Sequence, residues 1–294
     1  MPPRPNAGRR QATPLERRPT GQRVRTSRRG RLRVAWASIG VVLVAVAALV
    51  AVMATTGGGP RSSQVSPPAG TPVAENVVAR LTSVPLSTID AAPTAGLNAP
   101  TAIKDSPLTV DDKPDLLYIG AEFCPICAAE RWPLYVALSK FGTFNPAPGQ
   151  IHSAVSDGDI PTLTFYGTRY RSPYFTFSAE ETTTNQPSGN YYVPLQQLTA
   201  EQLALWQRHT DESFPWVDFG GKAQLATAQY DPGELEGLTF PAIASEVGDN
   251  ASTVGADIDG SAAVLIETIC SNLSDDRPAM VCRAKEPTGP GRAS

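Results

Sequence analysis

The chain has 294 residues, of which 41% are hydrophobic, a formal net charge of −3 and four cysteines. This length accommodates one good-sized domain with additional segments, and an even number of cysteines fits two intramolecular pairs. The sequence contains no phosphate-binding loop, metal-binding helix motif, serine triad or internal repeat, and therefore does not indicate the enzyme classes that depend on them.

The N-terminal part of the sequence has the pattern of a membrane anchor. Residues 1–33 contain eleven arginines and one acidic residue, Glu16, which predicts a disordered basic tail. An uncharged segment of 21 residues follows, Val34–Ala54, long enough at about 1.5 Å per residue to cross a bilayer. Because the basic tail adjoins this segment, we interpret it as a topology signal and expect no nucleic-acid partner. We predict a transmembrane helix in membrane lipid over residues 34–55, with a cytoplasmic N-terminus and an extracytoplasmic domain.

Whether this anchor is cleaved stays open. Val52-Met53-Ala54 is a weak cleavage site, and Ser27–Leu32 partly resembles a twin-arginine export signal, although Arg31 stands where that signal prefers an apolar residue. In each case the rest of the chain lies outside the cytoplasm. Residues 56–75 predict a flexible linker.

A strand, a turn with two cysteines and a helix form the central stretch of the sequence. The apolar run Leu116–Ile119 predicts a buried strand, and apolar residues from Trp132 to Phe141 recur about every 3.6 residues, which predicts an amphipathic helix. Cys124-Pro125-Ile126-Cys127 lies between them. A cysteine at a helix N-terminus is favoured as a thiolate by free N–H groups and the helix dipole. The second cysteine, one turn further on, is close enough to form a disulfide with the first.

The segment Gly120-Ala121-Glu122-Phe123-Cys124 resembles the lead-in to the dithiol of the thioredoxin superfamily, with Phe123 in place of a tryptophan. Pro125 follows the first cysteine as in DsbA-type oxidases and glutaredoxins. The longer run to Leu134 resembles a family of membrane-anchored, thioredoxin-like bacterial proteins, nine-two-nine in the domain-of-unknown-function series. The resemblance extends from about Val77 to Cys282. It implies an α/β, thioredoxin-like fold at residues 76–285, with a central mixed sheet flanked by helices, helical and hairpin insertions, and a disordered tail at 286–294.

The remaining elements follow from local patterns in chain order. Before the central strand we expect a helix at Val73–Leu81, a short strand at Leu86–Ile89 and loops at 91–112. After the central helix we expect a second parallel strand at Ile151–Val155, a hairpin from 162–166 and 174–177, and a polar loop at 180–190. The C-terminal part predicts a helix capped by Thr199 and ending near His209, a strand and tight turn at Trp216–Lys222, its antiparallel partner at Ala223–Tyr230, helical structure at Asp231–Val247, and a helix at Ser261–Leu273.

A thioredoxin-like site also requires a cis-proline opposite the dithiol, and two positions compete. Pro161 matches a thioredoxin Ile-Pro-Thr, whereas Pro215 precedes a strand, a glycine-containing turn and a second strand, as in DsbA-like proteins. The order of elements favours Pro215, and the possibility that neither is cis stays open. The resemblance implies a substrate-binding surface of Phe123, Pro125, Phe214 and Pro215, with Pro161 as the alternative cis-proline.

Some positions depart from the pattern of the superfamily. Tyr118 stands where thioredoxin has a buried acid, so the proton-handling group for Cys127 is missing or supplied elsewhere. Glu122 and Glu130 are near in sequence, but we expect them on the solvated surface. Ile126 replaces the histidine of DsbA, so we expect a less strongly acidified first thiol. We expect His152 and His209 in packing or capping roles.

Cys270 and Cys282 close a loop of 13 residues and are predicted to form a structural disulfide. A second redox pair and a four-cysteine metal site with Cys124 and Cys127 are the alternatives. The metal alternative is weak because zinc-binding cysteines usually recur as two short Cys-x-x-Cys pairs. We expect neither a metal nor another cofactor.

The sequence therefore predicts a membrane-anchored, extracytoplasmic thiol–disulfide oxidoreductase. Cys124 would be the attacking thiolate and Cys127 the resolving thiol, and the partners would be exported protein thiols or disulfides and an unidentified redox partner. Because of Tyr118, an alternative stays open in which the chain is a non-enzymatic, thioredoxin-like binding module of the cell envelope with a structural Cys124–Cys127 disulfide. A redox-sensing or metal-relay protein is a third hypothesis.

Overall fold

The computed structural model describes residues 70–273 and 278–282. These residues belong to one of the two units into which the chain divides, Val65–Ser294. The predicted basic tail, transmembrane helix, most of the linker and the C-terminal tail lie outside the described residues. None of the helices within the described residues is both long and apolar enough to cross a membrane.

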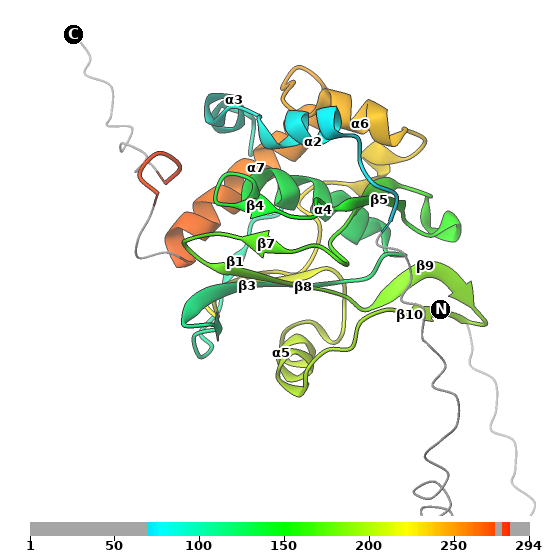
Figure 1. Cartoon of the computed structure of the whole chain (residues 1–294), viewed down its shortest axis with the longest axis vertical. Helices are drawn as coiled ribbons and strands as arrows, with labels where there is room; N and C mark the ends of the chain where they lie inside the picture. Colours follow the sequence, from blue (N-terminus) through cyan, green and yellow to red (C-terminus); the bar gives the residue numbers. More distant parts are fainter. Residues whose placement is uncertain (1–69, 274–277, 283–294) are drawn as a thin grey trace, which may run out of the picture. The chain divides into compact units, whose positions relative to one another are not determined.

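A mixed six-stranded sheet lies at the centre of the described unit (Figure 1). The pairing order is β1 (Thr101–Ala102), β12 (Ala223–Leu225), β11 (Trp216–Phe219), β3 (Lys113–Gly120) and β2 (Thr109–Val110), and β8 (Thr176–Glu181) also pairs with β3. The β3–β8 pair is parallel, whereas the other pairs are antiparallel. The predicted α/β class with a central mixed sheet is confirmed.

Helices cover both faces of this sheet. In Figure 1, α4 (Pro125–Leu138) and α7 (Thr253–Asn272) lie on one face and α5 (Ala200–Thr210) lies on the other. Three further helices pack outside α4 and α7, namely α2 (Glu75–Thr82), α3 (Leu86–Ala91) and α6 (Phe240–Glu246). Because α4 lies between the sheet and these outer helices, 12 of its 14 residues are buried. The prediction of an amphipathic helix was therefore wrong, since α4 exposes no polar face.

Alternate residues of β3 supply two separate apolar clusters. Leu116 and Tyr118 belong to the large cluster with α4 and α7, whereas Leu117 and Ile119 pack with Trp206 of α5. Successive side chains of a strand point to opposite faces, so a strand covered on both faces needs a continuous apolar run. This accounts for the predicted strand at Leu116–Ile119.

The predicted parallel strand at Ile151–Val155 was wrong. The chain there forms β5 (Gly149–His152), which pairs antiparallel with β6 (Pro161–Thr164) in a small separate sheet, and η1 (Val155–Asp157) follows. The predicted hairpin between 162–166 and 174–177 was wrong as well, because β6 pairs with β5 and β8 pairs with β3. A second small pair, β4 (Thr143–Phe144) with β7 (Tyr170–Arg171), completes an insertion between α4 and β8.

The region predicted as a polar loop at 180–190 is strand. It contains the end of β8 and β9 (Thr183–Ser188), which pairs antiparallel with β10 (Tyr191–Pro194). The β-branched threonines at 182–184 suit a strand, but their polarity concealed it. Leu86–Ile89, predicted as a strand, lies in α3. Four residues are too few to distinguish the periodicity of a helix from that of a strand.

The C-terminal part of the domain largely follows the prediction. Thr199 and Gln202 form the capping box of α5, β12 is antiparallel to β11, and η2 (Pro232–Leu235) precedes α6. The last helix, α7, begins at Thr253 and not at Ser261. Gly260 concealed this earlier start, because glycine is unfavourable in a helix; here a Cβ would overlap the Pro93 carbonyl oxygen. At the other end, Thr71, predicted as flexible linker, forms a bridge with Gln150.

Candidate functional site

Cys124 lies at the junction between the central strand β3 and the buried helix α4. β3 ends at Gly120, and Cys124 is the N-cap of α4 with φ −75° and ψ 122°. Its Sγ accepts a hydrogen bond from the Cys127 backbone N–H at 3.2 Å. Pro125 is the first helical residue, a position whose N–H makes no hydrogen bond within the helix, so proline is tolerated there. This geometry aims the free N–H groups of the helix at the sulfur atom, which favours a thiolate.

The two cysteines of this turn are free thiols in different environments. Cys127 is fully buried, and Cys124 has an exposed fraction of 6%. The hydrogen bond from the Cys127 side chain is the largest cause that lowers the pKa of Cys124; burial opposes it, and the Arg131 charge adds to the lowering. Burial, followed by the hydrogen bond to Cys124, raises the pKa of Cys127 well above its ordinary value. The pair thus has one thiol suited to attack and one that retains its proton.

Aromatic side chains surround Cys124 and explain its burial. Phe123 and Phe214 pack with the cluster that contains both cysteines, and their rings meet edge to face at 6.3 Å. Tyr192 of β10 stacks on Phe123 with ring centroids 4.3 Å apart. The hydroxyl of Tyr192 donates to Asp157 Oδ2, which holds the β9–β10 pair over the Phe123 ring. Tyr192 is not among the predicted site residues, because the polar residues before it predict a loop and not the β9–β10 pair.

Of the two competing prolines, Pro215 is preceded by a cis peptide bond. The bond lies between Phe214 and Pro215, directly before β11, and β11 pairs with β3. Pro161 is not among the cis residues; it begins β6, and its carbonyl accepts a hydrogen bond from Trp132 Nε1. A second cis bond, Asn145–Pro146, was not predicted.

The expectation that Glu122 and Glu130 lie on the solvated surface was wrong. Glu122 has an exposed fraction of 5% and accepts a hydrogen bond from Thr164 Oγ1 at 2.7 Å. Burial raises its pKa to about 7, and the nearby Glu181 adds to the rise. Glu130 is fully buried on α4, accepts a hydrogen bond from the Gln229 N–H at 3.1 Å, and has a pKa raised well above its ordinary value by burial. Glu130 is enclosed because α4 is covered by the sheet and by the outer helices, and Glu122 is buried although Phe123 and Pro125 beside it are partly exposed.

A buried ion pair lies beneath the same turn. Arg131 and Glu181 are both fully buried, and two hydrogen bonds join them: Nε to Oε1 at 2.9 Å and Nη2 to Oε2 at 2.7 Å. Arg131 Nη2 also donates to the Ala121 carbonyl at 2.8 Å. Sequence reasoning missed both charged residues. A signal for Arg131 was present, since it lies four residues after Cys127 and therefore on the same side of the helix.

Tyr118 occupies the position of the missing acid as part of the core. Its ring is fully buried and meets Phe165 edge to face at 5.4 Å. The ring also covers Gly120, where an added Cβ would overlap the tyrosine hydroxyl. That hydroxyl has no hydrogen-bond partner among the described residues. Burial raises the pKa of Tyr118 well above its ordinary value, so it stays neutral and cannot replace a carboxylate.

The second pair of cysteines is joined. Cys270, near the end of α7, forms a disulfide with Cys282, and their Cα atoms are 5.5 Å apart. Neither of these cysteines is free to join Cys124 and Cys127 in a four-cysteine site. The described residues contain no group of three or more histidine, cysteine or acidic side chains with a geometry that could hold a metal ion.

The histidines have local partners. His209 Nε2 lies 2.6 Å from Asp105 Oδ2 and its ring stacks on Trp216, while His152 Nδ1 lies 3.2 Å from Asp159 Oδ1. The stacking of His209 on Trp216 agrees with the packing role expected for it, whereas the role of His152 stays a prediction.

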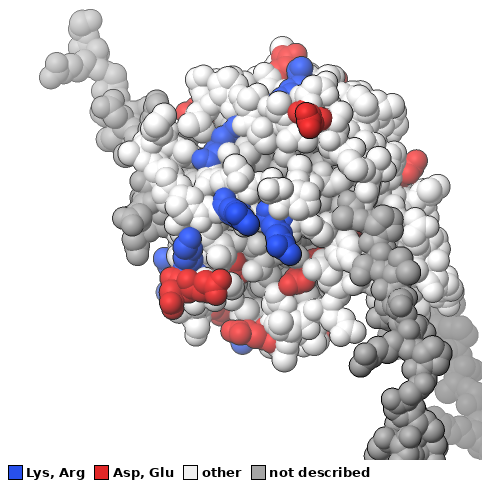
Figure 2. All heavy atoms as spheres, viewed as in Figure 1, with Lys and Arg blue, Asp and Glu red and all other residues white. Residues whose placement is uncertain are grey.

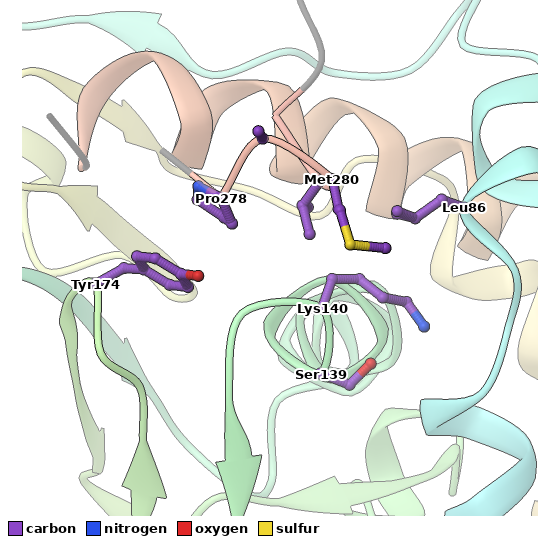
Figure 3. Close-up of a pocket in the computed structure, with 8 residues that line it drawn as sticks. Leu86, Ser139, Lys140, Tyr174, Pro278 and Met280 are labelled. Carbon is purple, nitrogen blue, oxygen red and sulfur yellow. The ribbon is translucent and has the colours of Figure 1, made fainter. Parts of the chain in front are cut away.

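A cavity of about 530 Å³ is lined by residues that do not belong to the cysteine turn (Figure 3). Lys140, Tyr174 and Met280 are among the residues that line it. The ammonium group of Lys140 donates to the carbonyls of Thr82 and Val84 at 2.9 and 2.8 Å, and burial lowers its pKa to about 8. Lys140 thus serves to hold the end of α2, and none of the four cysteines lines the cavity.

Surface charge differs from this buried arrangement. On the face in Figure 2, basic and acidic side chains of the described residues occur in small mixed groups, with much uncharged surface between them. The charges that act on the dithiol include two internal ones, Arg131 on both cysteines and Glu181 on Cys127.

Comparisons with known proteins give one family match over part of the chain and no function. No curated protein and no solved structure matches the chain. One family model, described as "Domain of unknown function (DUF929)", matches residues 99–201, a segment that includes the central strand, both cysteines of the turn, α4 and Glu181. The predicted resemblance to the DUF929 family is thereby confirmed over residues 99–201.

Proposed function

We propose that the chain is a membrane-anchored, extracytoplasmic thiol–disulfide oxidoreductase that acts on exported proteins through Cys124 and Cys127. The observation that carries this proposal is the position of Cys124 as N-cap of α4, with its sulfur bound by the Cys127 N–H. A thiolate at this position is stabilised by the helix N-terminus, whereas the buried Cys127 holds its proton.

The exchange would proceed in two balanced steps. The Cys124 thiolate attacks one sulfur of a substrate disulfide, forms a mixed disulfide, and releases the other substrate sulfur as a thiolate that takes up a proton. Cys127 then loses its proton and attacks Cys124 Sγ, which closes the Cys124–Cys127 disulfide and releases the remaining substrate thiolate. Two electrons pass from the dithiol to the substrate. A partner dithiol would restore the reduced form, and a partner disulfide would drive the reverse direction.

The arrangement of elements supports a thioredoxin-like fold for this domain. The strands pair in the order β8–β3–β11–β12. The β8–β3 pair is parallel, and the β3–β11 and β11–β12 pairs are antiparallel, in agreement with the mixed central sheet that the resemblance implies. The cis bond before Pro215 at the start of β11 supports the same assignment. The β5–β6 pair and the β9–β10 pair would then be the hairpin insertions.

The surroundings of Cys124 support a substrate-binding surface. Phe123, Pro125 and Phe214 are partly exposed, whereas Pro215 is buried. The Phe123 and Phe214 rings pack against the dithiol from two different elements of the chain. We propose that a substrate segment lies across these rings and presents its sulfur to Cys124.

The alternative, a binding module in which Cys124 and Cys127 form a structural brace, is favoured by one observation. Cys124 has an exposed fraction of only 6%, whereas a thiol that attacks a protein substrate must be accessible to it. In this alternative the aromatic rings around the cysteines would hold a partner protein of the envelope without exchange.

A redox titration of the full-length chain in detergent separates the two hypotheses. The protein is equilibrated in glutathione buffers, and alkylation with mass spectrometry reports the Cys124–Cys127 pair separately from Cys270–Cys282. We expect a potential between roughly −270 and −120 mV, as in dithiol oxidoreductases, whereas a brace would lie below about −300 mV.

A trapping variant provides the second measurement. Cys127→Ser removes the resolving thiol and should accumulate mixed disulfides between Cys124 and exported proteins in cells, whereas Cys124→Ser, the matched control, should accumulate none. A potential below about −300 mV together with no trapped protein would exclude the oxidoreductase in favour of the binding module.

We also propose that the chain is anchored in the membrane with its N-terminus in the cytoplasm, because a basic tail precedes the uncharged segment 34–55. Both segments lie outside the described residues. Protease added to intact spheroplasts should remove the domain and spare the N-terminal tail. Protection of the domain until lysis would contradict this topology.

A further inference from the structure

Arg131 is held in one orientation by three hydrogen bonds. Two connect it to the Glu181 carboxylate in a bidentate pair, and the third connects Nη2 to the Ala121 carbonyl. Bidentate arginine–carboxylate pairs fix the guanidinium plane as well as its position. Because both side chains are fully buried, the guanidinium cannot turn away into solvent.

These contacts place the guanidinium beneath the first turn of α4. The Ala121 carbonyl accepts from Arg131 Nη2 and also from the backbone N–H of Cys124, at 3.2 Å. Ala121 packs directly against Cys124 and Cys127. Arg131 and Cys127 are four residues apart on α4, one turn along the same side of the helix. One carbonyl group thus joins the guanidinium to the backbone of the reactive cysteine.

The arrangement is not explained by stability alone. A buried ion pair is often replaced by apolar residues without loss of stability, so its presence is weak evidence for a stabilising role. Arg131 Nη1 has no hydrogen-bond partner among the described residues, and neither has the hydroxyl of Tyr118. Tyr118, Arg131 and Cys127 are all fully buried, and the charges of Arg131 and of both cysteines act on the pKa of Tyr118. The interior therefore contains a fixed positive charge and unused donors beside the dithiol.

We propose that Arg131 is a positioning residue for the dithiol. Glu181 and the Ala121 carbonyl hold its guanidinium beneath the first turn of α4, so that the positive charge stabilises the thiolate of Cys124. The inference rests on the proposed function, because it assigns the charge that would tune the attacking sulfur. Arg131 touches neither substrate nor reacting atoms in this role. Glu181 acts in the opposite sense on the sulfur, since its own charge is negative, but it is needed to keep the guanidinium in place.

The test measures the thiolate of Cys124 directly. The full-length chain is reduced, and the rate of alkylation of Cys124 by iodoacetamide is followed by mass spectrometry as a function of pH. In Arg131→Met the midpoint of this profile should rise, because the positive charge that lowers the pKa of Cys124 is lost. Arg208→Met, at an exposed arginine of α5, is the matched control and should leave the midpoint unchanged.

A double variant keeps the test valid if a single variant fails to fold. Removing one partner of a buried pair leaves an uncompensated charge, whereas Arg131→Met with Glu181→Gln removes both charges together. Its midpoint should rise, because the Arg131 charge that lowers the pKa of Cys124 is removed. Circular dichroism confirms folding before the profile is measured.

The outcomes separate this inference from the proposed function. An unchanged midpoint in the folded double variant overturns the role of Arg131, even if the wild-type protein exchanges disulfides. Shifted midpoints in a protein whose Cys124–Cys127 pair neither exchanges nor traps a partner would support the role of Arg131 and overturn the oxidoreductase.

Discussion

Replacing Glu122 by glutamine is the sharpest test of the buried carboxyl groups near the dithiol. The substitution keeps the shape of the side chain and the oxygen that accepts from Thr164 Oγ1, but it removes the ability to carry a negative charge. Glu122 lies two residues before Cys124, and its backbone N–H donates to the Thr183 carbonyl, so the variant should fold in the same way.

The expected magnitude follows from the pKa of Glu122. Burial, with a contribution from Glu181, raises this pKa from 4.5 to about 7, so the folded protein holds the proton more tightly than the unfolded chain. A group with a raised folded pKa contributes stability that is fully present below pH 4.5 and is lost as the pH rises through about 7. The difference between about 7 and 4.5, at about 1.4 kcal/mol for each pH unit, gives about 3 kcal/mol.

Urea unfolding of the full-length chain at about pH 4.5 and about pH 8 measures this contribution. The wild-type protein should lose about 3 kcal/mol more of its free energy of unfolding between these pH values than Glu122→Gln does. Glu201→Gln, at an exposed carboxylate in the first turn of α5, is the control and should show the wild-type pH dependence. Equal losses in the wild type and in Glu122→Gln would refute the assignment of a buried, neutral Glu122.

Two further predictions concern stability away from the dithiol. Replacing Cys270 and Cys282 together by serine should lower the melting temperature, because a bridge that closes a loop of this length stabilises the fold by about 3 kcal/mol. The alkylation of Cys124 should stay unchanged. Two free thiols at these positions in protein isolated from its native compartment would contradict the structural role. Gly260→Ala should reduce the free energy of unfolding by about 1 to 3 kcal/mol, since the new Cβ overlaps the Pro93 carbonyl oxygen; an unchanged urea midpoint would show that the loop before β1 yields.

The parts of the site that lie close together in the sequence could be predicted. The apolar run of β3, the cysteine turn and α4 are consecutive, so local patterns place Cys124 at the helix N-terminus. Pro215 could also be favoured over Pro161, because a proline directly before a strand and a glycine turn indicates a specific order of elements. The pairing of strands could not be predicted in the same way. Periodicity identifies β6 and β8 as strands but contains no information on their partners, and this led to the wrong hairpin.

The buried charges could not be predicted, because burial of one side chain depends on which distant segments cover it. Glu181 faces the interior only because the β3–β8 register places it opposite Gly120, and that register depends on an insertion between α4 and β8 which the sequence did not reveal. Arg131 in turn faces Glu181 because both side chains point into the space below the cysteine turn. Arg131, four residues after the second cysteine of the turn, brings a positive charge into the interior. Its acidic partner, Glu181, lies on β8, the strand that pairs parallel with the strand before the dithiol.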